Sequence, residues 1–141
     1  MALTPAQMDQ KIDEHFAFEK SDDVAGVLST LAPDATHDVI GYPTGPSHGR
    51  EAARKFYEGL FSDLAESEVQ PVRRLYGNDF LVDESIWRGT AQGRPFGFEG
   101  RGRPLSFRLL HVVEFTEIGQ IKKEQVWLDF AAIFQQLSPS K

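Results

Sequence analysis

The sequence predicts an α+β fold in which three N-terminal helices pack against a cone-like, curved antiparallel sheet. Apolar residues follow helical spacing up to about residue 64, and from residue 69 onward they mostly alternate with polar residues as in strands. Helices followed by strands indicate helices on one face of a sheet, with a pocket between the two layers. A chain of 141 residues can bury one core, so we expect a single domain over residues 1–141.

Three helices are expected in the first half. Thr4-Pro5 is typical of a helix start, and the helix should run to about Lys20. A second helix over 24–31 follows the capping run 21–23 and should end before Pro33. A third helix over 50–64 has a broad apolar side.

Strands should dominate the rest of the chain. A short strand at 34–41 leads into a Pro/Gly-rich loop at 42–49, and Gly77-Asn78 is a strong hairpin signal. The expected elements after residue 64 are strands at 69–76 and 79–91, a Gly-rich loop at 92–102, a hairpin of 103–116 with 120–130, and a helical tail at 131–137.

The last hairpin carries most of the functional signal. Gly119 suits a three-residue loop that pairs Thr116 with Gln120, and the same register sets Glu114 opposite Lys122. One face would then hold Phe107, Leu109, His111, Val113, Phe115, Ile121, Gln125, Trp127 and Asp129. The other face would hold Leu110, Val112, Val126 and Leu128, which need a cover, and we expect a homodimer there.

Composition excludes several classes of function. The formal net charge of −6 argues against nucleic-acid binding, and the absence of cysteine excludes a thiol nucleophile. There is no apolar run of 18 residues and no signal-peptide pattern, so we expect a cytoplasmic protein without membrane association. The four histidines are scattered without metal-ligand spacing, so no metal is expected.

Asp129 is the first catalytic candidate. In an apolar cavity its pKa would rise from about 3.9 toward neutrality, which suits a general base. It could equally cap the helix that begins just after it. His111 could bind a substrate carbonyl or carry the proton, or it could be a core histidine bonded to Gln125.

Other polar residues could also reach the pocket. His37 should face inward with Ala35 and Val39, unless it is a polar residue at a strand edge. Asp83 or Glu84 could lie inside the cone as a second carboxylate, or pair with Arg73 or Arg74 on the neighbouring strand.

The order of elements, the segment 37–53 (HDVIGYPTGPSHGREAA), the Gly-rich loop and the ending 127–137 (WLDFAAIFQQL) resemble the SnoaL-like branch of the nuclear transport factor 2-like superfamily. This resemblance implies an α+β cone and covers nearly the whole chain. It also implies a cofactor-free cyclase with a carboxylate base near the last strand and a histidine on the strand before it. Asp129 and His111 match those two roles, although Glu124 or Gln125 could hold the place of the base.

We therefore expect a cofactor-free enzyme of cyclase or isomerase type that acts on a small hydrophobic or aromatic carbonyl compound. The catalytic candidates are Asp129 and His111, and the substrate-binding candidates are His37, Tyr57, Trp87, Phe107, Gln125 and Trp127. Two alternatives remain. The protein could be a dimeric module that binds a hydrophobic ligand without chemistry, or its cavity could be filled by its own phenylalanines.

Overall fold

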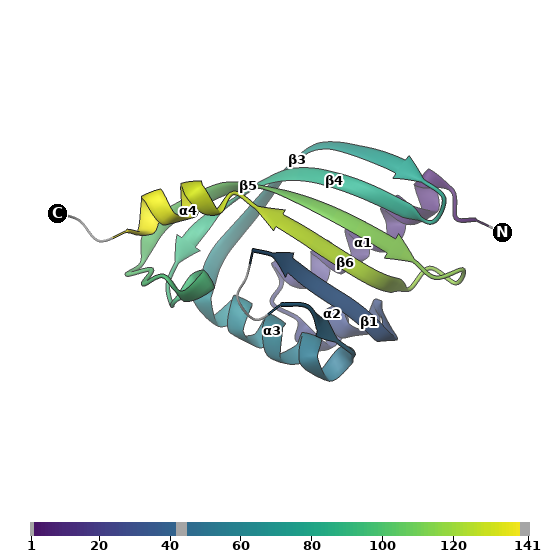
Figure 1. Ribbon diagram of the computed structural model, residues 1–141, viewed down its shortest axis with the longest axis horizontal. Coiled ribbons are helices and arrows are strands. Elements are labelled where there is room, and N and C mark those ends of the chain that lie inside the picture. Colours follow the sequence, from purple (N-terminus) through teal and green to yellow (C-terminus); the bar gives the residue numbers. More distant parts are fainter. Residues whose placement is uncertain (1, 42–44, 139–141) are drawn as a thin grey trace.

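A computed structural model of the chain describes residues 2–41 and 45–138. It contains a curved, unclosed six-stranded sheet with helices against it, and the α+β prediction is confirmed. Figure 1 shows α1 (Pro5–Lys20) running behind the sheet and α3 (Arg50–Asp63) along its lower edge. Residues 42–44 of the expected Pro/Gly-rich loop lie outside the described residues.

The strand order is β2-β1-β6-β5-β4-β3. The strands are β1 (Leu31–Ile40), β2 (Ser47–His48), β3 (Leu64–Gly77), β4 (Phe80–Ala91), β5 (Arg103–Phe115) and β6 (Ile121–Leu128). Neighbouring strands pair antiparallel except β1 and β6, which run parallel. The first and last long strands of the chain therefore lie side by side in the sheet.

Local sequence explains where α1 begins. The Thr4 side chain accepts a hydrogen bond from the Gln7 backbone, and the Gln7 side chain accepts one from the Thr4 backbone, which closes a capping box. Met8, Ile12 and His15 follow at helical spacing and are fully buried. This helix has the bounds that the sequence predicts.

The next segment differs from its prediction. Helix α2 (Val24–Ser29) ends two residues early, and Leu31 already begins β1. Pro33 lies inside β1, in the stretch where the register with β6 shifts between Leu31 and Thr36. The proline therefore interrupts the pairing of a strand and does not end a helix.

Two apolar clusters fill the space between the layers. The larger one joins α1, α2 and α3 to the middle of the sheet through residues such as Ile12, Tyr57 and Phe115. The smaller one packs α4 (Phe130–Leu137) against β4 and β5 around Trp87, with the short 3₁₀ turn η1 (Pro95–Gly97) beside it. None of the helices in the described ranges is long and apolar enough to cross a membrane.

The register of the final hairpin is the main correction. At the turn, the Thr116 N–H bonds the Gln120 carbonyl as predicted. Phe115 then pairs with Ile121, but Glu114 pairs with Lys123, so Lys122 is one extra residue in a β-bulge. Beyond the bulge every β6 side chain lies on the face opposite to the predicted one.

Candidate functional site

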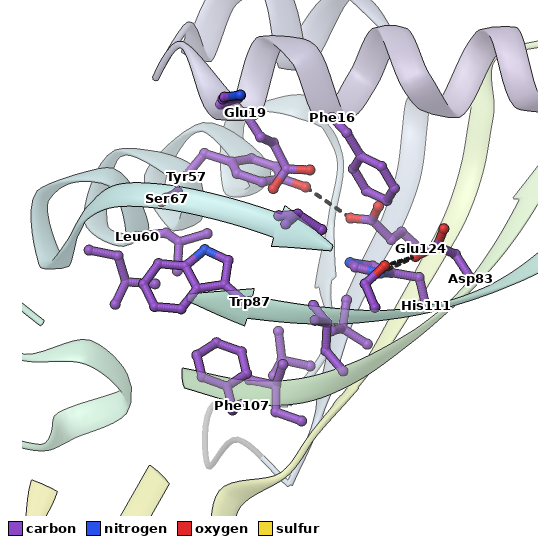
Figure 2. A pocket seen from close by; sticks show the side chains of 18 of the residues that line it. Phe16, Glu19, Tyr57, Leu60, Ser67, Asp83, Trp87, Phe107, His111 and Glu124 are labelled. Carbon is purple, nitrogen blue, oxygen red and sulfur yellow. Dashed lines mark hydrogen bonds and ion pairs between the residues drawn. The ribbon is translucent and has the colours of Figure 1, made fainter. Parts of the chain in front are cut away.

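A cavity of about 320 Å³ lies between the concave face of the sheet and helices α1 and α3. Most of its wall is apolar and aromatic. Trp87 on β4 and Phe107 on β5 stack with ring centroids 5.1 Å apart and planes 17° apart. Phe16 from α1 and Leu60 from α3 contribute to the helical side (Figure 2). A cavity of this size means that the protein's own phenylalanines do not fill the space.

Asp83 and His111 form the first polar group in this wall. They are direct partners across β4 and β5, so both side chains point inward. The carboxyl of Asp83 is 1% exposed and accepts hydrogen bonds from Arg74 Nε at 2.7 Å and Ser85 Oγ at 2.5 Å. Its Oδ1 lies 3.8 Å from His111 Nδ1, an ion-pair distance longer than a hydrogen bond (Figure 2).

Opposing effects set the pKa values of this pair. Burial alone would raise the pKa of Asp83, but the nearby His111 and the hydrogen bonds from Ser85 and Arg74 lower it to about 2. Burial would lower the pKa of His111, but Asp83 together with the charges of Glu124 and Glu19 raises it above its ordinary 6.5. Asp83 therefore stays ionised and favours a proton on the imidazole.

The imidazole of His111 has a ring nitrogen that a bound ligand could contact. The residue is 8% exposed, and its Nδ1 is buried without a hydrogen bond to any described residue. Because Nδ1 faces Asp83, Nε2 is the ring nitrogen left for a bound molecule. The ring packs against Phe16 at a centroid distance of 5.0 Å, so one side of the group is apolar.

Glu124 on β6 is the centre of a second polar group. Its carboxyl is 2% exposed, and Oε1 accepts a hydrogen bond from the Tyr57 hydroxyl at 2.9 Å. His37 Nε2 lies 3.2 Å from the same oxygen. The other oxygen, Oε2, lies 3.3 Å from His15 Nε2, and His15 also meets Glu19 at 3.1 Å.

The opposite charges of this second group shift one another's pKa values away from those that burial alone would give. Burial would raise the pKa of Glu124, but His15 and His37 hold it well below 4.5. Burial would lower the pKa of His15, but Glu124 and Glu19 raise it to about 10. Burial and then the charge of Glu124 raise the pKa of Tyr57 well above 10, so the phenol keeps its proton.

Five of the predicted site residues lie in the cavity wall, namely His37, Tyr57, Trp87, Phe107 and His111. Of the two possibilities left open for Asp83 and Glu84, both occur: Asp83 lines the cavity and pairs with Arg74, and Glu84 pairs with Arg73. Burial at 8% exposure and contact with Glu124 show that His37 faces inward.

Three predicted site residues lie elsewhere. Asp129 is exposed, and its Oδ1 accepts a hydrogen bond from the Ala132 N–H, so it caps α4 and does not line the cavity. Gln125 and Trp127 lie on the outer face of the sheet because the bulge at Lys122 reverses β6. For the same reason Val126 and Leu128 face inward.

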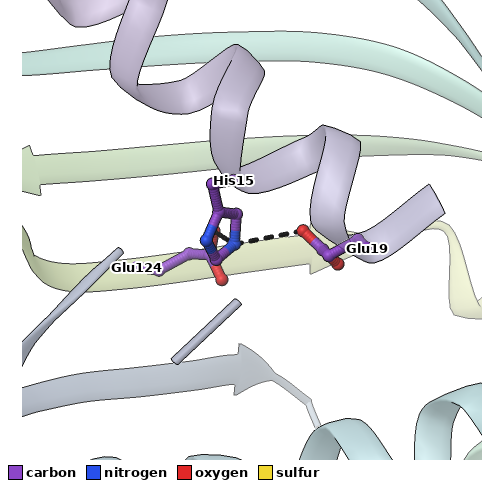
Figure 3. A group of neighbouring side chains, drawn as sticks. All are labelled: His15, Glu19 and Glu124. Carbon is purple, nitrogen blue, oxygen red and sulfur yellow. Dashed lines mark ion pairs between the residues drawn. The ribbon is translucent and has the colours of Figure 1, made fainter. Parts of the chain in front are cut away.

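Sequence reasoning missed the group around His15. The four histidines are scattered along the sequence, and only the fold brings His15 and Glu19 together with Glu124. His15 and Glu19 are four apart on α1, a spacing that places both on one helix face. Among the described residues, His15, Glu19 and Glu124 bring their ligand atoms close enough together to hold a metal ion (Figure 3).

Solved structures of low sequence identity share this fold. A candidate SnoaL-like polyketide cyclase from Jannaschia sp. CCS1 aligns with a TM-score of 0.85 and 16% identity over 100% of this chain and 99% of that one. TerC co-crystallised with polyporic acid aligns with a TM-score of 0.77 and 17% identity over 94% and 99%. A protein from Catenulispora acidiphila with a ketosteroid isomerase-like fold, in complex with trimethylamine, aligns with a TM-score of 0.76 and 14% identity over 98% and 96%.

Sequence comparison assigns the family. No curated protein matches the chain significantly. The family model of the SnoaL-like polyketide cyclases, in contrast, matches residues 7–137, which include every element of the sheet and every residue of both polar groups. The chain therefore belongs to the SnoaL-like polyketide cyclase family.

Proposed function

We propose that this protein is an enzyme that moves a proton on a small hydrophobic carbonyl compound, in a reaction of cyclase or isomerase type. The observation that carries the proposal is His111, buried between the Asp83 carboxylate and an apolar cavity. The neutral imidazole would take a proton from the carbon next to the carbonyl through Nε2, and the C–H electrons would pass into an enolate. The same proton would return when the new bond or the isomer forms, so the step needs no cofactor.

His111 suits the role of base better than the carboxylates do. An efficient general base has a pKa near the working pH, and the carboxylates around His111 outweigh burial and raise its pKa above the ordinary 6.5. Asp83, with a pKa of about 2, is a weak base and serves to orient the ring. Glu124 is also a weak base, because His15 and His37 hold its pKa well below 4.5 and its Oε1 already accepts a hydrogen bond from Tyr57.

The walls of the cavity suit a planar apolar substrate. Trp87 and Phe107 offer a stacked aromatic surface, and Phe16 lies beside the reactive imidazole. His37 and Tyr57 border the same space and would shape it at the polar end. The ligand seen with TerC, polyporic acid, is a reasonable first probe for binding.

One observation favours a second candidate function, the binding of a hydrophobic ligand without chemistry. The hydroxyl groups of Ser85 and Tyr57 already donate to carboxylates within the protein. They are therefore not free to stabilise an oxyanion, which in many enzymes is the largest catalytic effect. On this alternative, His111 would only orient the ligand.

Proton exchange separates the two candidates. β-Tetralone, a bicyclic ketone with acidic α-protons, is incubated with the protein in D₂O and deuterium uptake is followed by NMR. We expect catalysed uptake that falls about 100-fold or more in His111→Gln. His48→Gln, which changes an exposed histidine, should exchange like the unaltered protein.

The expected rate should also rise with pH, with a midpoint above 6.5, because only the neutral imidazole accepts a proton. Equal exchange in His111→Gln and the unaltered protein would remove His111 from the mechanism. Binding of polyporic acid, seen as quenching of Trp fluorescence, without exchange of any ketone would favour the binding module.

We further propose that two copies pair through the outer face of the sheet. With the corrected register this face carries Leu110 and Val112 on β5 and Trp127 on β6, whose side chain is 38% exposed. Leu75 on β3 is also exposed and follows Val82 and Val112 across the sheet. An exposed apolar patch of this kind is typical of an interface.

A further inference from the structure

His15, Glu19 and Glu124 present three metal-ligand atoms at one point between α1 and β6 (Figure 3). His15 Nε2 lies 3.1 Å from Glu19 Oε2 and 3.3 Å from Glu124 Oε2. Nitrogen and oxygen ligands of a tetrahedral ion lie about 2.0–2.1 Å from it, which places them about 3.3 Å from one another. The spacing therefore matches two edges of a coordination tetrahedron.

The hydrogen bonds of Thr30 determine which nitrogen of His15 faces the carboxylates as a ligand. Thr30 Oγ1 donates its proton to the Val27 carbonyl at 2.6 Å, so it must accept from His15 Nδ1, which lies 2.7 Å away. In the neutral ring Nδ1 then carries the hydrogen and Nε2 a lone pair. In the metal-free protein the pKa of His15, about 10, keeps a proton on Nε2 between the two carboxylates, and a bound ion would take the place of that proton. A hydrogen-bonded Nδ1–H is common behind metal-binding histidines.

Glu124 supplies an independent observation. Its Oε1 is held by Tyr57 and His37, which leaves Oε2 directed toward His15. Oε2 is buried and accepts no hydrogen bond from any described residue. A buried carboxylate oxygen without a donor is costly, and a bound ion would satisfy it.

The net charge of His15, Glu19 and Glu124 also favours a bound metal ion. A proton on His15 supplies one positive charge, whereas Glu19 and Glu124 together carry two negative charges. A divalent ion with a neutral imidazole would bring the group to zero, which matters because His15 and Glu124 are buried. Glu19, with a side chain 24% exposed, provides a route from solvent.

We propose that His15, Glu19 and Glu124 bind one divalent transition-metal ion that ties α1 to β6. One imidazole with two carboxylates suits Zn²⁺, Co²⁺ or Mn²⁺ better than Ca²⁺ or Mg²⁺, which prefer oxygen ligands alone. The Thr30, Tyr57 and His37 side chains would orient the ligands from behind. The three ligands do not include His111, although Glu19 and Glu124 line the same cavity, and the proposal does not depend on the reaction proposed above.

The test uses Co²⁺ and Zn²⁺ alone on chelator-treated full-length protein, at mildly alkaline pH where protons compete less. We expect Co²⁺ to give the visible absorption of a tetrahedral site, and each ion to raise the Tm. Glu19→Gln should bind at least about 10-fold more weakly, since it removes a ligand. Glu14→Gln is the matched control, because it makes the same charge change on an exposed position of α1 and should bind normally.

Two results would overturn the proposal. The first is a protein whose Tm and visible spectrum do not respond to either ion. The second is an equal response in Glu19→Gln, which would assign the ions to the surface. Circular dichroism of each variant checks that it is folded. Glu19→Asp keeps the charge but moves the carboxylate oxygens away from the metal position, so it should also bind weakly. Ketone exchange by the chelated protein reports separately on His111, so each proposal can fail alone.

Discussion

Asp83 and Asp129 carry the same carboxyl group in opposite surroundings. Asp83 is enclosed by Arg74, Ser85 and His111 inside the sheet, whereas Asp129 lies in solvent and holds one N–H of α4. The sequence predicts a pocket role for Asp129 because it follows an apolar strand. For Asp83 it leaves open a place inside the cone or an ion pair with Arg73 or Arg74 on the neighbouring strand, and the structure shows the cavity position together with the Arg74 pair.

The pKa of Asp83 leads to a prediction about acid stability. Its folded-state pKa of about 2 lies below the ordinary 3.8, so its ionised form stabilises the fold above about pH 4, and this contribution is lost as the pH falls toward 2. The difference corresponds to about 2 kcal/mol. In denaturant unfolding, the gap in stability between the protein and Asp83→Asn should therefore shrink by about that amount from neutral pH to about pH 2. A gap that stays constant with pH would mean that the carboxyl is not held in its ionised form.

At the scale of elements, the turn of the final hairpin could be predicted from the local sequence, whereas its strand register could not. Gly119 and the pairing of Thr116 with Gln120 follow from turn chemistry, and both are present in the structure. The bulge at Lys122 does not follow from turn chemistry, because an extra residue is accommodated only if the packing of both strands favours it. The bulge brings Glu124 inward and turns Gln125 outward.

Helix α4 provides the next prediction. Asp129→Ala removes the side chain that caps its first turn, so we expect a loss of about 1 kcal/mol in the free energy of unfolding. Asp129→Ser keeps a capping oxygen and should lose little. Ketone exchange and polyporic acid binding should be unchanged in both, because Asp129 lies outside the cavity. A fall in exchange without a fall in stability would return Asp129 to the site.

At the scale of the molecule, the order of elements and the α+β layers could be predicted. Both follow from the spacing of apolar residues and from the Gly, Pro and capping residues that mark the ends of elements. The parallel pairing of β1 with β6 could not be predicted, since nothing local links residues 36–40 to 123–127. The same long-range contact brings His37 to Glu124, and the docking of α1 brings His15 there. The second polar group is thus a product of tertiary structure, and the sequence alone did not reveal it.

The outer face of the sheet predicts the assembly state. Trp127→Glu places a charge in the centre of the proposed interface, next to Leu110, and should convert a dimer into a monomer at micromolar concentration in sedimentation. Phe134→Glu is the control, because it changes an exposed aromatic residue on α4, away from that face. A monomer in the unaltered protein, or a dimer that survives Trp127→Glu, would contradict this interface.

The bulge in β6 also determines which residues of that strand line the cavity. Because Lys122 is the extra residue of the bulge, deleting it would keep Glu124, Val126 and Leu128 facing the cavity. Regular pairing of Lys122 with Glu114 would instead exchange those three for Gln125 and Trp127 without altering any of the five residues. The lining of this cavity therefore depends on how one lysine pairs at the start of β6, as well as on which residues stand in the wall.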